Sequence, residues 1–211
     1  MRRTIERITW YDSPSTIYEN VLLNPGWSYR YHKQDYKIRD MALIFLLYIS
    51  AARVTEIVGG KVLIGNVVKK LEPLNVDQFI LEDKTLWIRG LKIVKQKYVK
   101  RGSRWLPVLE ARDYPERIPI PLFLDEEPFN KFTIIIKDHL EARPSGAPLF
   151  EMTRGRVNQI INEYGQFPHY YRDMGLKLWK RYFENDSFKL KKFSGHKRWS
   201  SLEKYMGEEL F

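Results

Sequence analysis

The spacing of hydrophobic and polar positions changes several times along the chain, and each change marks a predicted element. Residues 38–48 are apolar on nearly all sides, which is typical of a buried helix. Residues 54–58 predict a second, short helix that ends at Gly59 and Gly60. The residues between the two helices, 50–53, are therefore expected to form a tight junction.

The middle of the chain has the composition and alternation of β-strands. Residues 76–81 predict one strand, and residues 85–99, rich in Ile, Val, Trp and Tyr, predict one or two more. Residues 100–103 are typical of a turn, after which residues 104–109 predict a returning strand. A small antiparallel sheet is the simplest interpretation of this pattern.

Helical patterns return in the C-terminal half, after a proline-rich segment that is predicted to be irregular. The irregular segment covers residues 112–128, and the predicted helices cover residues 129–141, 154–164, 168–183 and about 200–206. Helices around a small sheet predict an α+β fold that is mainly helical. Residues 1–35 can hold a short helix but are too few for an independent DNA-binding domain. We therefore expect a short N-terminal segment over 1–35 and one domain over 36–211.

The charge balance narrows the choice of partner. Lys and Arg number 36 and Asp and Glu 26, so the formal net charge is +10. Such a balance favours a polyanionic partner, either nucleic acid or an acidic membrane surface, although a merely soluble basic protein has the same charge. The longest apolar run, 41–49, is too short to span a bilayer, and we find neither a signal peptide nor a basic amphipathic helix. The interpretation is a cytoplasmic protein without a membrane partner.

Several kinds of site lack the residues that they need. The chain has no cysteine, which excludes disulfides and thiol catalysis. Its histidines, His32, His139, His169 and His196, do not pair at metal-ligand spacing. Neither a phosphate-binding glycine loop nor a GxSxG turn is present. We therefore expect no cofactor, no metal and no small-molecule substrate.

Two stretches place cations beside groups that suit phosphate chemistry. Arg53 directly follows the apolar helix, where a guanidinium is costly unless it meets an anion. Glu56 lies one turn further on, so a plain structural ion pair is the alternative. His169 and Arg172 are three residues apart, on one face of a predicted helix. This pair suits the binding of a phosphate, and an ordinary polar helix start is its alternative.

A third stretch lies near the C-terminus. Tyr205 follows His196 by nine residues, within a segment rich in lysine and arginine. Taken alone, a tyrosine in a chain with 13 of them is far more often a packing residue than a nucleophile.

Together the three stretches resemble the boxes of the tyrosine recombinase (phage integrase) family, in the same order. Residues 39–57, RDMALIFLLYISAARVTEI, are similar to the family's RDxALLLLLYxTGLRVSEL. Residues 169–176, HYYRDMGL, resemble HxLRHTFA, and KFSGHKRWSSLEKYMG resembles LLGHSSxxTTxxYxH with the same nine-residue spacing. The likeness covers roughly residues 36–207.

The resemblance implies an enzyme that cuts and rejoins DNA strands through a 3′-phosphotyrosyl intermediate at Tyr205. Arg53 and Arg172 would hold the non-bridging oxygens of the scissile phosphate. His169 would be the general base or share that clamp, and His196 would hydrogen-bond the phosphate. Such transesterification needs an in-line nucleophile, neutralised oxygens and a proton for the leaving group, and it needs neither metal nor nucleotide.

The family's general acid is a lysine on a hairpin, and its position in this chain is open. Counting from the turn at 83–84 favours Lys92, while Lys95, Lys97 and Lys100 compete. The last three, with Lys197 and Arg198, are expected to bind DNA. The implied partners are double-stranded DNA and further copies of the chain.

This sequence departs from the family pattern in three ways. Asp173 stands where histidine often follows the second-box arginine, only about 35 residues precede the first box, and six follow Tyr205. These departures leave open a compact enzyme of an archaeal or viral mobile element, acting in the host cytoplasm if viral. They also leave open a catalytically inactive DNA-binding module of the same fold, and a topoisomerase-like DNA-relaxing activity.

Overall fold

The computed structural model describes residues 12–23, 34–64, 67–92, 94–111, 117–196 and 198–206. Its helices are α1 (Pro14–Leu23), α3 (Gln34–Ile49), α4 (Val54–Val58), α5 (Asn130–Glu141), α6 (Arg154–Glu163), α7 (Pro168–Tyr182), α8 (Ser187–Ser194) and α9 (Glu203–Met206), with 3-10 turns η1 (Val76–Gln78) and η2 (Trp199–Ser201). Its strands are β1 (Gly60–Ile64), β2 (Val67–Leu71), β3 (Phe79–Glu82), β4 (Thr85–Ile88), β5 (Val94–Arg101), β6 (Arg104–Ala111) and β7 (Ile120–Phe123). The predicted α+β class is confirmed.

Helix α3 lies at the centre of the body, as its uniformly apolar sequence predicts. Residues 40–49 of this helix are buried on all sides, so it contributes to the core from every face. Phe45 packs against Phe132 of α5 with ring centroids 5.1 Å apart. Helix α1 also joins this core, because Ile17 and Val21 are buried and Tyr18 stacks on Phe45. Part of the segment before residue 36 therefore packs with the rest of the domain.

Helices α3 and α7 approach each other unusually closely, and this contact fixes the position of the second box. A Cβ added to Gly175 of α7 would lie 1.9 Å from the Tyr48 carbonyl oxygen of α3. One turn later, the indole N–H of Trp179 donates to the Ile49 carbonyl. Only glycine permits this approach, which carries the neighbouring Arg172 up to the end of α3.

The strands form two sheets rather than the one that was expected. Strands β3, β4 and β7 make an antiparallel sheet against the body. A second sheet has the order β2-β1-β6-β5 and joins two hairpins, β1–β2 and β5–β6, through a parallel pairing of Leu63 with Glu110. The β1–β2 hairpin was missed, because its lysine-rich second strand lacks the apolar alternation of a half-buried strand.

The predicted elements differ from the structure in several further places. Residues 76–78 form the turn η1, so strand β3 begins at Phe79. The proline-rich segment contains strand β7, which is an edge strand of its sheet and can therefore accommodate proline. Helix α8 was not predicted, although Asp186 caps it by accepting from the N–H groups of Phe188 and Lys189, and Gly195 ends it with a φ of 68°. The last predicted helix, 200–206, is split into η2 and α9.

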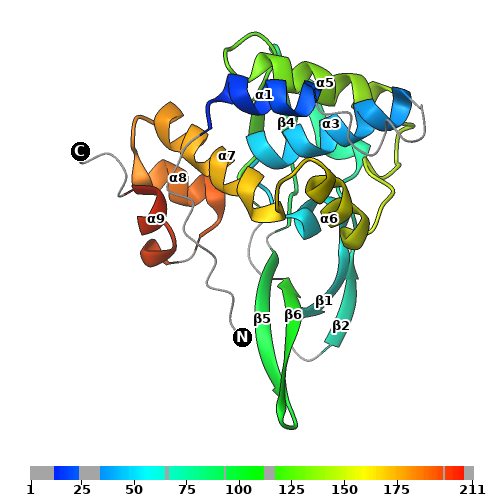
Figure 1. Ribbon diagram of the computed structural model, residues 1–211, viewed down its shortest axis with the longest axis vertical. Coiled ribbons are helices and arrows are strands. Elements are labelled where there is room, and N and C mark those ends of the chain that lie inside the picture. Colours follow the sequence, from blue (N-terminus) through cyan, green and yellow to red (C-terminus); the bar gives the residue numbers. More distant parts are fainter. Residues whose placement is uncertain are drawn as a thin grey trace.

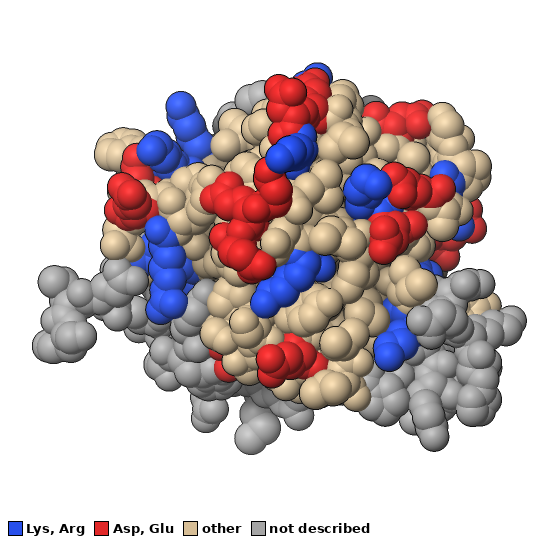
Figure 2. Space-filling model, turned by 90° about the horizontal axis from the view of Figure 1, so that it is seen from above, with Lys and Arg blue, Asp and Glu red and all other residues tan. Residues whose placement is uncertain are grey.

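The two hairpins project together from the helical body (Figure 1). Their four strands contain eight Lys and Arg residues and a single Glu, so much of the net charge of +10 lies in this projection. On the face of the body turned away from the hairpins, acidic and basic side chains stand next to each other (Figure 2). Within the described residues, no helix is long and apolar enough to cross a membrane.

Candidate active site

Arg53 lies at the corner between α3 and α4, where it caps the short helix. Its guanidinium donates to Glu56 at 2.8 Å, and its backbone N–H donates to the other carboxylate oxygen of Glu56 at 2.9 Å. Glu56 is only 3% exposed, whereas the Arg53 side chain keeps 26% of its surface. The structural ion pair between Arg53 and Glu56 is therefore present, and part of the Arg53 side chain also remains exposed to solvent.

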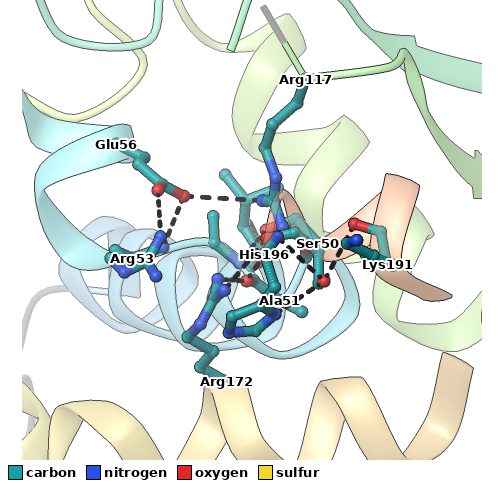
Figure 3. Close-up of polar contacts among 11 residues, drawn as sticks. Ser50, Ala51, Arg53, Glu56, Arg117, Arg172, Lys191 and His196 are labelled. Atoms are coloured by element: carbon teal, nitrogen blue, oxygen red, sulfur yellow. Dashed lines mark hydrogen bonds and ion pairs between the residues drawn. The ribbon is translucent and has the colours of Figure 1, made fainter. Parts of the chain in front are cut away.

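A second guanidinium, that of Arg117, reaches the same carboxylate from the segment before β7 (Figure 3). It lies 3.5 Å from Glu56 and donates to the carbonyls of Ser50 and Ala51 at 3.3 and 3.4 Å. Its side chain is buried, and the guanidinium carbon lies 5.6 Å from the centre of the Phe193 ring. Sequence reasoning missed this residue, which lies in the proline-rich segment. The available signal was a single arginine directly before the apolar positions of a strand.

Arg172 approaches the same corner from α7. It is 3% exposed, and it donates to the carbonyls of Ala51 and Ser194, the latter at 3.2 Å. Burial, and then the nearby charge of Arg53, lower the pKa of Arg172 to about 9, while Glu56 opposes the shift. A guanidinium in this position gains from any anion that comes within reach.

The backbone at Ala51 is arranged to receive these donors. Ala51 has a φ of 46°, a left-handed conformation that costs a non-glycine residue about 1–2 kcal/mol. Ser50 stabilises the turn by donating to Leu46 and by accepting from the Ala52 N–H. The Ala51 carbonyl thereby faces both Arg117 and Arg172. The junction predicted over residues 50–53 is thus the place where the arginines meet.

Glu56 is the acidic centre of this arrangement. Burial raises its pKa, but the charges of Arg117, Arg53 and Arg172 outweigh burial and leave the pKa below its ordinary value. The carboxylate is therefore ionised at neutral pH. We call Arg53, Arg117, Arg172 and Glu56 the arginine cluster. It contains three guanidinium groups and one carboxylate, so it carries an excess of positive charge.

Tyr205 lies beside the arginine cluster on α9. The side chain is 3% exposed, and its hydroxyl donates to Asp173, the residue after Arg172 on α7. Burial and then Asp173 raise the pKa of Tyr205, against which the charges of Arg172 and Arg53 act. Tyr205 thus lies close enough to both arginines for their charges to act on the phenol.

His196 and His169 occupy different surroundings. The His196 ring centroid is 6.3 Å from that of Tyr205, and its Nδ1 lies 2.7 Å from the Ser194 hydroxyl. His169 is exposed at the second position of α7, one turn before Arg172. The structure therefore places His196 next to the phenol and His169 at the surface.

The candidate lysines are spread along the chain between β4 and the hairpin tip. Lys92 is exposed and follows Leu91, whose carbonyl accepts the Arg117 backbone N–H at 3.0 Å. Lys95 and Lys97 lie on β5, and Lys100 is exposed near the far end of that strand, opposite Trp105. Lys92 is thus the one whose neighbouring backbone contacts the arginine cluster, and its role stays a prediction.

Two of the expected DNA-binding residues are neighbours in the sequence, Lys197 and Arg198. Arg198 is exposed and directly precedes η2. Lys197 lies outside the described residues. Among the residues that the structure describes, no group of three or more His, Asp or Glu side chains could hold a metal ion.

The comparisons with known proteins support the fold. No protein-family model and no curated protein matches the chain. Among solved structures, the chain is similar to residues 82–397 of the Tn1549 transposon integrase, in complex with circular intermediate DNA, with a TM-score of 0.50 and 12% sequence identity. The match covers 93% of this chain and 60% of that integrase chain. The chain therefore shares the fold of part of an integrase.

Proposed function

We propose that this protein cuts and rejoins DNA strands as tyrosine recombinases do, with Tyr205 as the nucleophile. The observation that carries the proposal is the arginine cluster, in which three guanidinium groups converge around the carboxylate of Glu56. A phosphodiester would supply the missing negative charge. Preorganised guanidinium groups around a transferring phosphoryl group are the main source of catalysis in such chemistry.

The roles of the other residues follow from this arrangement and from the family resemblance. Arg53 and Arg172 would hold the non-bridging oxygens, while Arg117 would keep Glu56 and the Ala51 turn in place. His196 would share the phosphate, and Lys92 would protonate the leaving 5′ oxygen. The basic hairpin strands that carry Lys95, Lys97 and Lys100 are suited to the DNA backbone. Recombination between two sites would require further copies of the chain on double-stranded DNA.

Incubation with nicked suicide duplexes of randomised sequence tests the proposal. We expect a denaturant-resistant protein–DNA adduct with the wild-type protein and none with Tyr205→Phe, because the phenyl ring has no oxygen to bond phosphorus. Tyr182→Phe is a matched control, since Tyr182 is exposed on the same domain and its hydroxyl lies 3.4 Å from Glu126. This variant should form adducts at the wild-type rate.

A second function, a DNA-binding module without catalysis, is favoured by the burial of Tyr205 and its bond to Asp173. It predicts tight DNA binding with no adduct from any site in the library. Relaxation of supercoiled plasmid without strand exchange would instead indicate a topoisomerase-like activity of the same residues.

A further inference from the structure

The contact between Tyr205 and Asp173 joins the proposed nucleophile to a carboxylate. Asp173 follows Arg172 on α7, and its side chain accepts the hydrogen bond of the phenol. In the family that the sequence resembles, this position is often histidine. The aspartate therefore introduces a negative charge directly at the oxygen that would attack phosphorus.

We propose that Asp173 is the general base that takes the proton of Tyr205 during strand cleavage. The inference rests on the proposed function and assigns one chemical step within it. A carboxylate can accept the proton of a hydroxyl that attacks phosphorus, as the catalytic aspartate of protein kinases does. A general base must lie within hydrogen-bond reach of the proton that it removes, and Asp173 already meets that condition in the free protein.

The step balances with the groups at hand. The Tyr205 oxygen forms a bond to phosphorus, and the bond from phosphorus to the 5′ oxygen breaks. The phenolic proton passes to the carboxylate of Asp173, and the 5′ oxygen takes a proton from the general acid. In rejoining, the 5′ hydroxyl attacks phosphorus and gives its proton back to the deprotonated general acid, and protonated Asp173 returns its proton to the departing Tyr205 oxygen.

The surroundings of the phenol explain why the acceptor must be in contact. Burial and Asp173 keep the pKa of Tyr205 above its ordinary value, so the group is a neutral phenol at neutral pH. Its proton must therefore leave as the new bond forms rather than beforehand. His169, the base that the family resemblance implies, is exposed at the start of α7, whereas Asp173 is bonded to the reacting oxygen.

The decisive variant is Asp173→Asn, measured by the rate of adduct formation on a suicide duplex. The amide oxygen can still accept the phenol hydrogen bond, but it cannot take the proton. We expect the rate to fall by about 10²–10⁴-fold. The remaining rate should rise about tenfold per pH unit as hydroxide replaces the base. Asp173→Glu restores a carboxylate and should recover at least about a tenth of the wild-type rate.

Two comparisons separate Asp173 as the base from a general acid and from His169 as a competing base. A duplex with sulfur in place of the bridging 5′ oxygen supplies a leaving group that needs no proton, so it should not rescue Asp173→Asn. His169→Asn should lose less activity than Asp173→Asn. Rescue by sulfur, a larger loss in His169→Asn, or an Asp173→Asn rate within about threefold of wild type would each overturn the inference.

The same assay distinguishes this inference from the function on which it rests. Adducts that require Tyr205 but not Asp173 leave strand cleavage standing and remove only the base assignment. If the wild-type protein forms no adduct on any duplex, both are overturned. A melting temperature for Asp173→Asn close to that of the wild type shows that the lost rate is chemical.

Discussion

The arginine cluster and the Tyr205 hydroxyl lie side by side but are held in different ways. The cluster is fixed by α3, α4, α7 and the segment before β7, and the guanidinium groups of Arg117 and Arg172 donate to backbone carbonyls directly after α3. Tyr205 sits on α9, a helix of four residues, and its hydroxyl donates to the carboxylate of Asp173. The first region is a rigid site with excess positive charge, and the second is a neutral group on a short element.

This difference suggests that the arginine cluster serves to bind an anion and that the Tyr205 hydroxyl serves to react. A site that must gather a phosphate gains from being assembled in advance, because no reorganisation is then needed when the charge arrives. A nucleophile must instead move toward phosphorus and lose a proton, so a position on a short helix suits it better. Substitutions in the cluster should therefore affect stability, anion binding and any reaction that depends on that binding, whereas loss of the phenol should remove the reaction and change the pH dependence of stability.

Glu56→Gln should have the largest effect on stability. It leaves the buried guanidinium of Arg117 and the charge of Arg53 without their carboxylate, which costs about 3–5 kcal/mol when one partner of a buried ion pair is removed. Urea unfolding measures the loss, and added sulfate should recover part of it by binding the cluster. The control is Glu72→Gln, whose carboxylate is exposed and pairs with Lys70, and it should change stability by less than about 0.5 kcal/mol. Equal stability of Glu56→Gln and wild type would contradict the stabilising role assigned to the Glu56 carboxylate in the arginine cluster.

Arg172→Lys should lower adduct formation by about 10²–10³-fold, because an ammonium cannot replace the forked donors that face the Ala51 and Ser194 carbonyls and would face the proposed phosphate. Single-turnover rates on a suicide duplex measure this loss. Arg181→Lys makes the same substitution at an exposed position of the same helix and should stay within about twofold of the wild type. Similar rates for the two variants would show that Arg172 has no special part in the chemistry.

The smallest expected effect concerns alkaline pH. Burial and Asp173 raise the pKa of Tyr205 above its ordinary value of 10.0, so its contribution to stability is complete below pH 10 and is lost as the pH rises further. At pH 11 the unfolded chain gains about 1.4 kcal/mol by releasing a proton that the folded chain retains. Between pH 8 and 11, wild type should therefore lose about 1.4 kcal/mol more unfolding free energy than Tyr205→Phe. Equal losses would mean that the phenol ionises as readily when folded.

The sequence predicted the parts of the fold in which the local pattern and the burial agree. The uniformly apolar α3 and the amphipathic α5, α6 and α7 lie close to their predicted bounds. In each, the helical spacing of the apolar residues alone determines which side chains are buried. The β1–β2 hairpin did not follow from the pattern, since its strands gain their place by pairing with the distant β6. Such non-local pairing leaves little trace in the sequence of either strand.

The candidate site was predictable where its residues stand in recognisable boxes, as Arg53, Arg172 and Tyr205 do. Arg117 was not, because its role depends on a chain reversal that brings it back to the end of α3. Asp173 was noticed only as a departure from a pattern. Its contact with Tyr205 comes from the packing of α9 on α7, which no spacing between the two residues reveals.

The hydrogen bond from the Arg117 backbone N–H to the Leu91 carbonyl closes the chain at the base of the β5–β6 hairpin. Lys92 and Arg117 are thus anchored next to each other, however long the segment between them is. That segment contains strands β5 and β6. Under the proposed function, replacing it with hairpins of different length and charge would change the DNA contacts made outside the arginine cluster. If the proposed function holds, the projection is the natural place to engineer new target preference.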